Sequence, residues 1–180
     1  MEPRERLTFW WEATGAAWAL ARALEQGPSL EGRRAVELGC GPGLVGIAAG
    51  LRGAHVTFTD GEDEALALAA ENARDAELPP ERCAFEKLDW EQPGDAGTYD
   101  LVLGSEIAYD YWVHGELVAL LERLVAPEGE AWLADRPRLA IHRFLGRVRG
   151  AGFAVETEEI DLDEPSFPAQ RVALYHLTRR

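Results

Sequence analysis

The chain has 180 residues, 47% of them apolar, and its 32 Asp and Glu against 18 Lys and Arg give a formal net charge of −14 at pH 7. This length and composition predict one acidic globular domain over 1–180, with 1–30 as an N-terminal cap segment and 31–180 as the core. Lys87 is the single lysine and the arginines are scattered, which argues against a nucleic-acid partner, because phosphate binding needs clustered positive charge.

The N-terminal segment loosely imitates a secretion signal, since Arg4 and Arg6 precede an apolar stretch. Glu12 interrupts that stretch, and its apolar residues recur with helical spacing, so a helix with one apolar stripe is favoured over a signal peptide. No apolar run reaches the ~20 residues that a membrane span needs. Cys40 and Cys83 form neither a CxxC pair nor a metal-ligand pattern. The sequence therefore predicts a cytoplasmic protein without a metal site, a disulfide framework or a membrane partner.

Short apolar runs alternate with helical segments along most of the chain, as in consecutive strand–helix units of a parallel sheet. Helical spacing occurs at residues 13–24, 44–51, 66–73, 117–124 and 137–150. The expected strands are residues 34–38, 54–59, 83–88, 99–104, 130–134, 153–160 and 172–177.

Three local signals set the expected ends of these elements. Pro127 and Gly129 should end the helix before the fifth strand, and Asp135 should cap the last helix. The last two strands are joined by a proline-bearing loop with no room for a helix, so they should pair antiparallel. The predicted fold is α/β, with a seven-stranded, mostly parallel sheet, helices on both faces and an antiparallel last strand.

A glycine-rich turn follows the first expected strand and precedes a helix. Its glycines are Gly39, Gly41, Gly43 and Gly46. Such glycines let a ligand approach the backbone closely. The last three also satisfy the dinucleotide pattern GxGxxG, and Asp60 lies about where a ribose-binding acid would. No Lys or Arg lies near the loop to bind a pyrophosphate, which favours a ligand without phosphates over a nicotinamide dinucleotide, the remaining alternative.

Four elements at strand ends together resemble the class I S-adenosylmethionine-dependent methyltransferases. They are Glu37 ahead of GCGPG, Asp60, Leu88-Asp89-Trp90, and the stretch from Gly104 to Tyr109. More narrowly, the strings ELGCGPGLVGIAA, LDW and YDLVLGSEIAY are similar to the lysine methyltransferase branch of the methyltransferase-like proteins, family 16. The resemblance covers nearly the whole chain. It implies a Rossmann-like fold and S-adenosyl-L-methionine as the cofactor.

The resemblance also implies a set of cofactor contacts. They are Trp10, Glu37, Gly39, Gly41, Gly43, Asp60, Asp89, Trp90 and Ser105. The carboxylate of Asp60 can accept from both ribose hydroxyls, and Asp89 from the adenine amino group, while Trp90 offers a flat apolar wall. Glu37 would orient the methionine end. Structural roles remain as alternatives, because Asp60 also suits a helix N-cap and Trp10 and Trp90 also suit simple packing.

Glu106 and Tyr109 are the expected catalytic residues, because they match the D-x-x-Y element that holds the target amine in this branch. Glu replaces Asp here, which lengthens the carboxylate arm by one methylene. Methyl transfer needs a neutral amine in line with the sulfonium, and such positioning can supply ~7 to 11 kcal/mol. A carboxylate beside an ammonium raises the pKa of that ammonium, so Glu106 is expected to bind and orient the amine rather than deprotonate it.

The expected partner is a protein that presents a lysine side chain, and the second candidate acceptor is a small amine metabolite. An acidic, aromatic mouth near Tyr109 suits a cation. No Asn-Pro-Pro-Tyr follows the fourth expected strand, which disfavours adenine and glutamine as acceptors. A protein that binds the cofactor without catalysis is the rival from another class. The sequence makes no prediction about oligomeric state.

Overall fold

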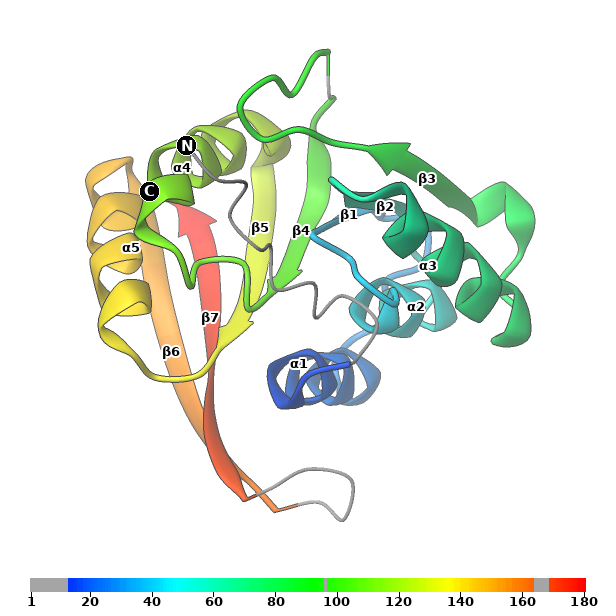
Figure 1. Cartoon of the computed structure of the whole chain (residues 1–180), viewed down its shortest axis with the longest axis horizontal. Coiled ribbons are helices and arrows are strands. Elements are labelled where there is room, and N and C mark those ends of the chain that lie inside the picture. Colours follow the sequence, from blue (N-terminus) through cyan, green and yellow to red (C-terminus); the bar gives the residue numbers. More distant parts are fainter. Residues whose placement is uncertain (1–12, 96, 164–168) are drawn as a thin grey trace, which may run out of the picture.

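A twisted seven-stranded sheet is the centre of the structure, a computed structural model that describes residues 13–95, 97–163 and 169–180 (Figure 1). The strands are β1 (Arg34–Leu38), β2 (His55–Asp60), β3 (Cys83–Lys87), β4 (Tyr99–Ser105), β5 (Val125–Asp135), β6 (Phe153–Leu162) and β7 (Gln170–Arg179). Their order is β3-β2-β1-β4-β5-β7-β6. The pairs among β1 to β5 are parallel, and β7 is antiparallel to both β5 and β6. The predicted α/β sheet with an antiparallel last strand is confirmed.

Helices cover both faces of this sheet (Figure 1). They are α1 (Gly15–Gln26), α2 (Leu44–Leu51), α3 (Asp63–Asp75), α4 (His114–Leu124) and α5 (Leu139–Gly150), with short 3-10 turns at Pro80–Arg82 and Tyr111–Val113. Buried residues of α1, α2 and α3 belong to one hydrophobic cluster, and those of α4 and α5 belong to a second. The sheet therefore separates two cores, as its two-sided apolar strands predict.

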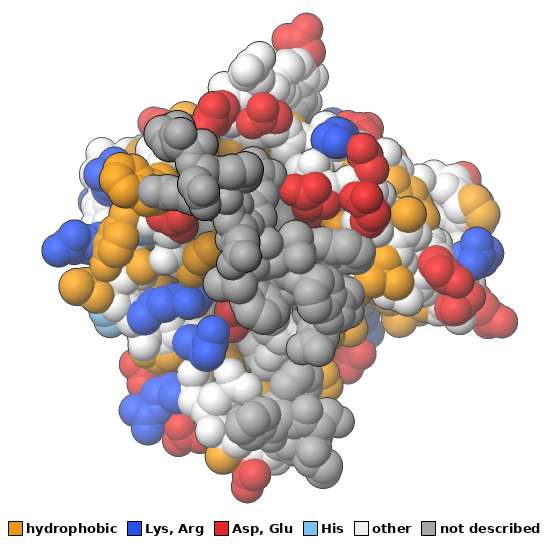
Figure 2. All heavy atoms as spheres, in the orientation of Figure 1, with side chains coloured by type: hydrophobic (Ala, Val, Ile, Leu, Met, Phe, Trp, Pro, Cys, Tyr) orange, Lys and Arg blue, Asp and Glu red, His pale blue; other side chains and the backbone are white. Residues whose placement is uncertain are grey.

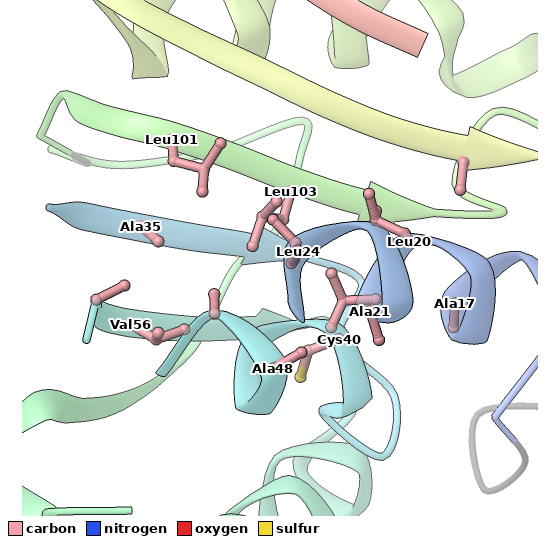
Figure 3. Packing of buried hydrophobic residues seen from close by; sticks show 14 of the residues in the cluster. Ala17, Leu20, Ala21, Leu24, Ala35, Cys40, Ala48, Val56, Leu101 and Leu103 are labelled. Atoms are coloured by element: carbon pink, nitrogen blue, oxygen red, sulfur yellow. The ribbon is translucent and has the colours of Figure 1, made fainter. Parts of the chain in front are cut away.

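The first of these cores forms around α1, whose apolar stripe was evident in the sequence. Leu20 and Leu24 lie beside Leu103 of β4 (Figure 3), and all three are buried. Each such leucine contributes roughly 1.5 to 3 kcal/mol by its removal from water. The helix begins where the Thr14 side chain accepts a hydrogen bond from the backbone N–H of Ala17 at 3.2 Å. Helix α1 therefore packs against the sheet through its buried leucines.

Two predicted boundaries are wrong: the start of β5 and the start of α5. The strand begins at Val125, directly after α4, and not at residue 130. Its register against β4 shifts between the pairs Tyr99–Val125 and Leu101–Glu130. This irregularity accommodates Pro127. A Cβ on Gly129 would lie 2.8 Å from the carbonyl oxygen of Tyr99, so the close approach needs glycine.

The last helix also begins later than predicted. Asp135 is the final residue of β5 and does not cap a helix, because α5 starts at Leu139 after Arg138, which makes no side-chain cap hydrogen bond. The carboxylate of Asp135 instead pairs with the guanidinium of Arg138. This ion pair ties the end of β5 to the start of α5.

Strand β6 forms one edge of the sheet, and most of its exposed residues are acidic. Glu156, Glu158 and Glu159 are exposed there. The β6–β7 hairpin extends beyond the helices at the lower end of Figure 1. Among the residues that the structure describes, no helix has the length and apolarity to cross a bilayer.

Candidate cofactor and acceptor site

The glycine-rich turn joins β1 to α2 at the carboxyl edge of the sheet, where open α/β folds bind ligands. Gly39, Gly41 and Gly43 all have positive φ, at 60°, 49° and 82°. L side chains rarely adopt this backbone conformation. A Cβ on Gly43 would also lie 3.0 Å from Cβ of Ala69 in α3. The turn therefore needs glycines both for its path and for its packing.

Glu37 is a buried acid directly beneath this turn, with 2% of its surface exposed. Its Oε2 accepts a hydrogen bond of 2.9 Å from the backbone N–H of Gly46 in α2. Burial raises the pKa of Glu37 from 4.5 to about 8, against the lowering effect of the backbone hydrogen bonds from Gly46 and Val45. A cationic ligand group next to Glu37 would favour the ionised form of this carboxyl group.

Asp60 ends β2 and holds the turn from the neighbouring strand. Its Oδ2 accepts from the N–H of Gly41 at 3.0 Å, and its Oδ1 accepts from the N–H of Glu62 at 3.1 Å. Each carboxylate oxygen has further lone pairs, so ribose hydroxyls can bind to the same group. The alternative role as the N-cap of α3 is wrong, because that helix begins at Asp63 and its N-cap residue is Glu62.

Asp89 and Trp90 follow β3 at the same edge. Asp89 is exposed, and its Oδ1 accepts from the N–H of Glu91 at 2.9 Å. A Cβ on Gly39 would lie 3.6 Å from Cζ2 of Trp90, so the indole borders the glycine turn. Trp90 also packs against the core cluster beneath α4 and α5. The indole of Trp90 therefore packs against both the glycine turn and the core, and its contact with a cofactor stays a prediction.

Glu106 follows β4, the other strand that flanks β1. Its backbone has a φ of 50°, a left-handed conformation that is costly for a non-glycine residue. Its N–H donates to the carbonyl oxygen of Ala134 at 2.8 Å, which fixes this conformation against β5. Ser105, half-buried, ends β4 opposite Ala134. Tyr109 lies beyond and is 62% exposed.

Two arginines that the sequence interpretation missed close around Glu106. Nε of Arg136 lies 3.2 Å from Oε1, and its Nη2 lies 3.3 Å from Oε2. Nη2 of Arg138 lies 3.8 Å from Oε2, and its guanidinium lies 5.9 Å from the centre of the Tyr109 ring. A signal was present in the sequence, since Arg136-Pro137-Arg138 directly follows β5, the strand beside β4. We call Glu106, Asp135, Arg136 and Arg138 the rim ion cluster.

Asp135 is the most buried member of the rim ion cluster, with 2% of its side chain exposed. Burial raises the pKa of Asp135 from 3.8 to about 6, and the charge of Arg138 opposes that rise. Among the described residues, Oδ2 of Asp135 and Nε of Arg138 are buried without a hydrogen-bond partner. Asp135 therefore depends on Arg138 for its ionised form.

The structure thus brings all but one of the predicted contact residues to one edge of the sheet. Trp10 lies outside the described residues. In the described part of the chain, no three His, Cys, Asp or Glu side chains are arranged to hold a metal ion. The glycine turn has no Lys or Arg within it, and Asp60 offers carboxylate oxygens, so this edge suits an uncharged ribose better than a phosphate.

The fold and this arrangement of residues define a class I methyltransferase architecture. The chain superposes on magnesium protoporphyrin IX methyltransferase from Synechocystis PCC 6803, solved with bound S-adenosylmethionine, with a TM-score of 0.68 and 22% identity. The match covers 90% of this chain and 77% of that one. At this identity the likeness shows the fold alone.

Residues 8–149 match the family model described as Lysine methyltransferase, and the chain belongs to this family. It is 35% identical over 146 residues to EEF1A lysine methyltransferase 3 of Mus musculus, which covers 77% of this chain and 61% of that protein. It is 37% identical over 161 residues to protein N-lysine methyltransferase METTL21A of Danio rerio, which covers 81% of this chain and 73% of that protein. The chain thus spans about three fifths to three quarters of the length of these relatives.

Proposed function

We propose that the protein transfers the methyl group of S-adenosylmethionine to the side-chain amine of a lysine in another protein. The observation that carries the proposal is the adjacency of two sets of residues. Glu37 and Asp60 hold the glycine turn from beneath and beside it, and Glu106 follows the strand next to that turn. Both sets lie within the segment that matches the lysine methyltransferase family, whose relatives carry lysine methyltransferase names.

On the cofactor side, each residue has a distinct task in this proposal. Asp60 binds the ribose hydroxyls while it keeps its hydrogen bond to Gly41. Glu37 orients the methionine end, and Asp89 and Trp90 contact the adenine. When bound, S-adenosylmethionine supplies an activated methyl group on a sulfonium centre. Trp10, Ser105 and the glycines at 39, 41 and 43 complete the proposed set.

On the acceptor side, Glu106 and Tyr109 orient the amine toward the cofactor. The side chain of Ile107 reaches the glycine turn, because its Cγ2 would lie 3.1 Å from a Cβ on Gly39. The residues that follow β4 are therefore close to the proposed cofactor site. Tyr109, Tyr111 and Trp112 are exposed around this place, at 62%, 44% and 74%. An exposed aromatic rim suits a lysine carried by a protein surface better than a small amine in a closed pocket.

The proposal also covers the location, domain organisation and partners of the protein. We place it in the cytoplasm, a compartment that suits the free thiols of Cys40 and Cys83. We further propose one domain over residues 1–180, with 1–30 as a cap segment, and a partner that is neither a nucleic acid nor a membrane.

The test is methyl transfer from tritiated S-adenosylmethionine into an extract, separated into macromolecules and small-molecule filtrate. We expect label on lysine in the protein fraction. Glu106→Gln and Tyr109→Phe should each reduce it at least tenfold, because they remove groups that orient the amine. Both variants should keep their affinity for S-adenosylhomocysteine, and Glu122→Gln on α4 is the matched control. Label in the filtrate alone would contradict the protein acceptor, and unchanged transfer in both variants would contradict their catalytic role.

A further inference from the structure

A lone carboxylate at position 106 would create a problem that the rim ion cluster reduces. A single carboxylate beside an amine stabilises the ammonium form, whose lone pair cannot attack a methyl group. In this protein two guanidinium groups contact that carboxylate. Glu106 is also well shielded, with 17% of its side chain exposed, so its charge is only partly screened by water.

The charges within the rim ion cluster balance. Glu106 and Asp135 supply two carboxylates, and Arg136 and Arg138 supply two guanidinium groups, linked by contacts of 3.2 Å and 3.8 Å and by the Arg138–Asp135 pair. Arg138 also contacts the ring of Tyr109, so it connects both proposed catalytic residues. On the face shown in Figure 2, Lys and Arg side chains gather on the side of α5, whereas Asp and Glu side chains are more frequent on the opposite side.

We propose that Arg136 and Arg138 are positioning residues that hold the carboxylate of Glu106 and offset its charge, so that the acceptor amine binds in its neutral form. This inference rests on the proposed function. The two oxygens of Glu106 meet Arg136 through two contacts, which fixes the orientation of the carboxylate as well as offsetting its charge. Glu106 can then accept a hydrogen bond from the amine without attracting a full positive charge.

The test uses sinefungin, a cofactor analogue that carries a protonated amine in place of the transferred methyl group. Its affinity is compared with that of S-adenosylhomocysteine, which lacks this amine, by calorimetry at pH 7. The ratio of the two affinities reports the charge felt at the methyl position. Any general damage to folding or to the cofactor site affects both ligands and cancels in the ratio.

Arg136→Gln removes a positive charge and should raise the ratio in favour of sinefungin by roughly fivefold. Glu106→Gln removes a negative charge and should lower the ratio by a similar factor. Arg147→Gln, an exposed arginine of α5 outside the cluster, should leave it unchanged. Opposite shifts in the first two variants are the expected signature of charge balance, because loss of structure alone cannot produce them.

Equal ratios in the wild-type protein, Arg136→Gln and Glu106→Gln would overturn the inference and leave the proposed function intact. The same conclusion would follow if Arg136→Gln weakened both ligands by one common factor, since that indicates structural support only. If the wild-type protein bound neither ligand, the proposed function and this inference would both be overturned.

Discussion

Gly46 donates its backbone N–H to Oε2 of Glu37 over 2.9 Å, deep inside the junction of β1 and α2. A Cβ on Gly46 would lie 2.7 Å from the same oxygen, so this hydrogen bond is possible only because position 46 is glycine. The third glycine of the GxGxxG pattern thus serves the packing of a buried acid. The GxGxxG pattern therefore has a structural explanation here that does not require a dinucleotide.

The first prediction concerns Glu37 and pH. Its pKa is about 8 in the folded protein against 4.5 as the reference value, so the stability that the protonated group supports is complete below pH 4.5 and is lost as the pH rises through 8. Glu37→Gln cannot ionise and keeps an acceptor for Gly46. Without ligand, the free energy of unfolding of the variant minus that of the wild type should increase between pH 5 and pH 9, by on the order of 3 kcal/mol. Urea unfolding measures it, and a difference that stays constant with pH would contradict the buried, protonated state.

The second prediction compares two helical glycines. Gly46→Ala should destabilise the protein by roughly 1 to 3 kcal/mol, because the new Cβ would meet Cε1 of Phe58 at 2.4 Å. Gly146→Ala is the matched control in α5, where nothing lies within 4 Å of the new Cβ. There the substitution should stabilise by roughly 0.5 to 1 kcal/mol through helix propensity. Chemical denaturation of both variants gives the sign of each change in the free energy of unfolding. The same sign for both variants would refute the packing explanation.

The third prediction concerns Asp60. Asp60→Asn replaces one of the two oxygens that accept from Gly41 and Glu62, and it removes the charge that would bind ribose hydroxyls. Its affinity for S-adenosylhomocysteine should fall at least tenfold, as is typical for the loss of charge-assisted hydrogen bonds. Calorimetry provides the measurement. Asp75→Asn, at the exposed end of α3, should retain wild-type affinity, and equal affinities for all three proteins would exclude a ribose contact at position 60.

The fourth prediction concerns Arg138 and Asp135. Arg138→Met leaves a buried carboxylate without its ion pair and should destabilise the protein by roughly 2 to 3 kcal/mol at pH 7.5. The pKa of Asp135 is already raised to about 6, and removal of the neighbouring charge raises it further. The stability gap to the wild type should therefore shrink as the pH falls toward 5, where Asp135 takes up a proton.

A second substitution separates charge from packing at this place. Asp135→Asn in the Arg138→Met background should recover most of the lost stability at pH 7.5, since no buried charge then remains. A gap that is independent of pH, together with no recovery in the double variant, would show that Arg138 acts only through its packing.

The alternation of apolar runs sufficed to predict the sheet and the helices, because two-sided burial of strands and one-sided burial of helices leave different periods in the sequence. The interval from α4 to β5 was mispredicted for a physical reason. Pro127 and Gly129 usually interrupt regular structure, but here the shift of register between β4 and β5 absorbs them. Such irregularity depends on the partner strand and is not visible in local sequence.

The proposed contact residues came from the family resemblance, and those that the structure describes lie at or just after the carboxyl ends of strands. The ion-pair partners of Glu106 were not predicted, although Arg136 and Arg138 follow the neighbouring strand β5. Their importance depends on the left-handed backbone of Glu106, which directs its carboxylate toward them. A sequence pattern records the residue types at the ends of strands but not which side chains meet across them.

The exposed glutamates of the edge strand β6 bear on how copies of this protein meet each other. An open sheet edge offers unpaired backbone groups to any other strand, and like charges placed opposite each other oppose such pairing. Glu156, Glu158 and Glu159 thus oppose edge-to-edge assembly of two copies of this protein. The same charges that make the chain acidic thereby also help to keep its copies apart in solution.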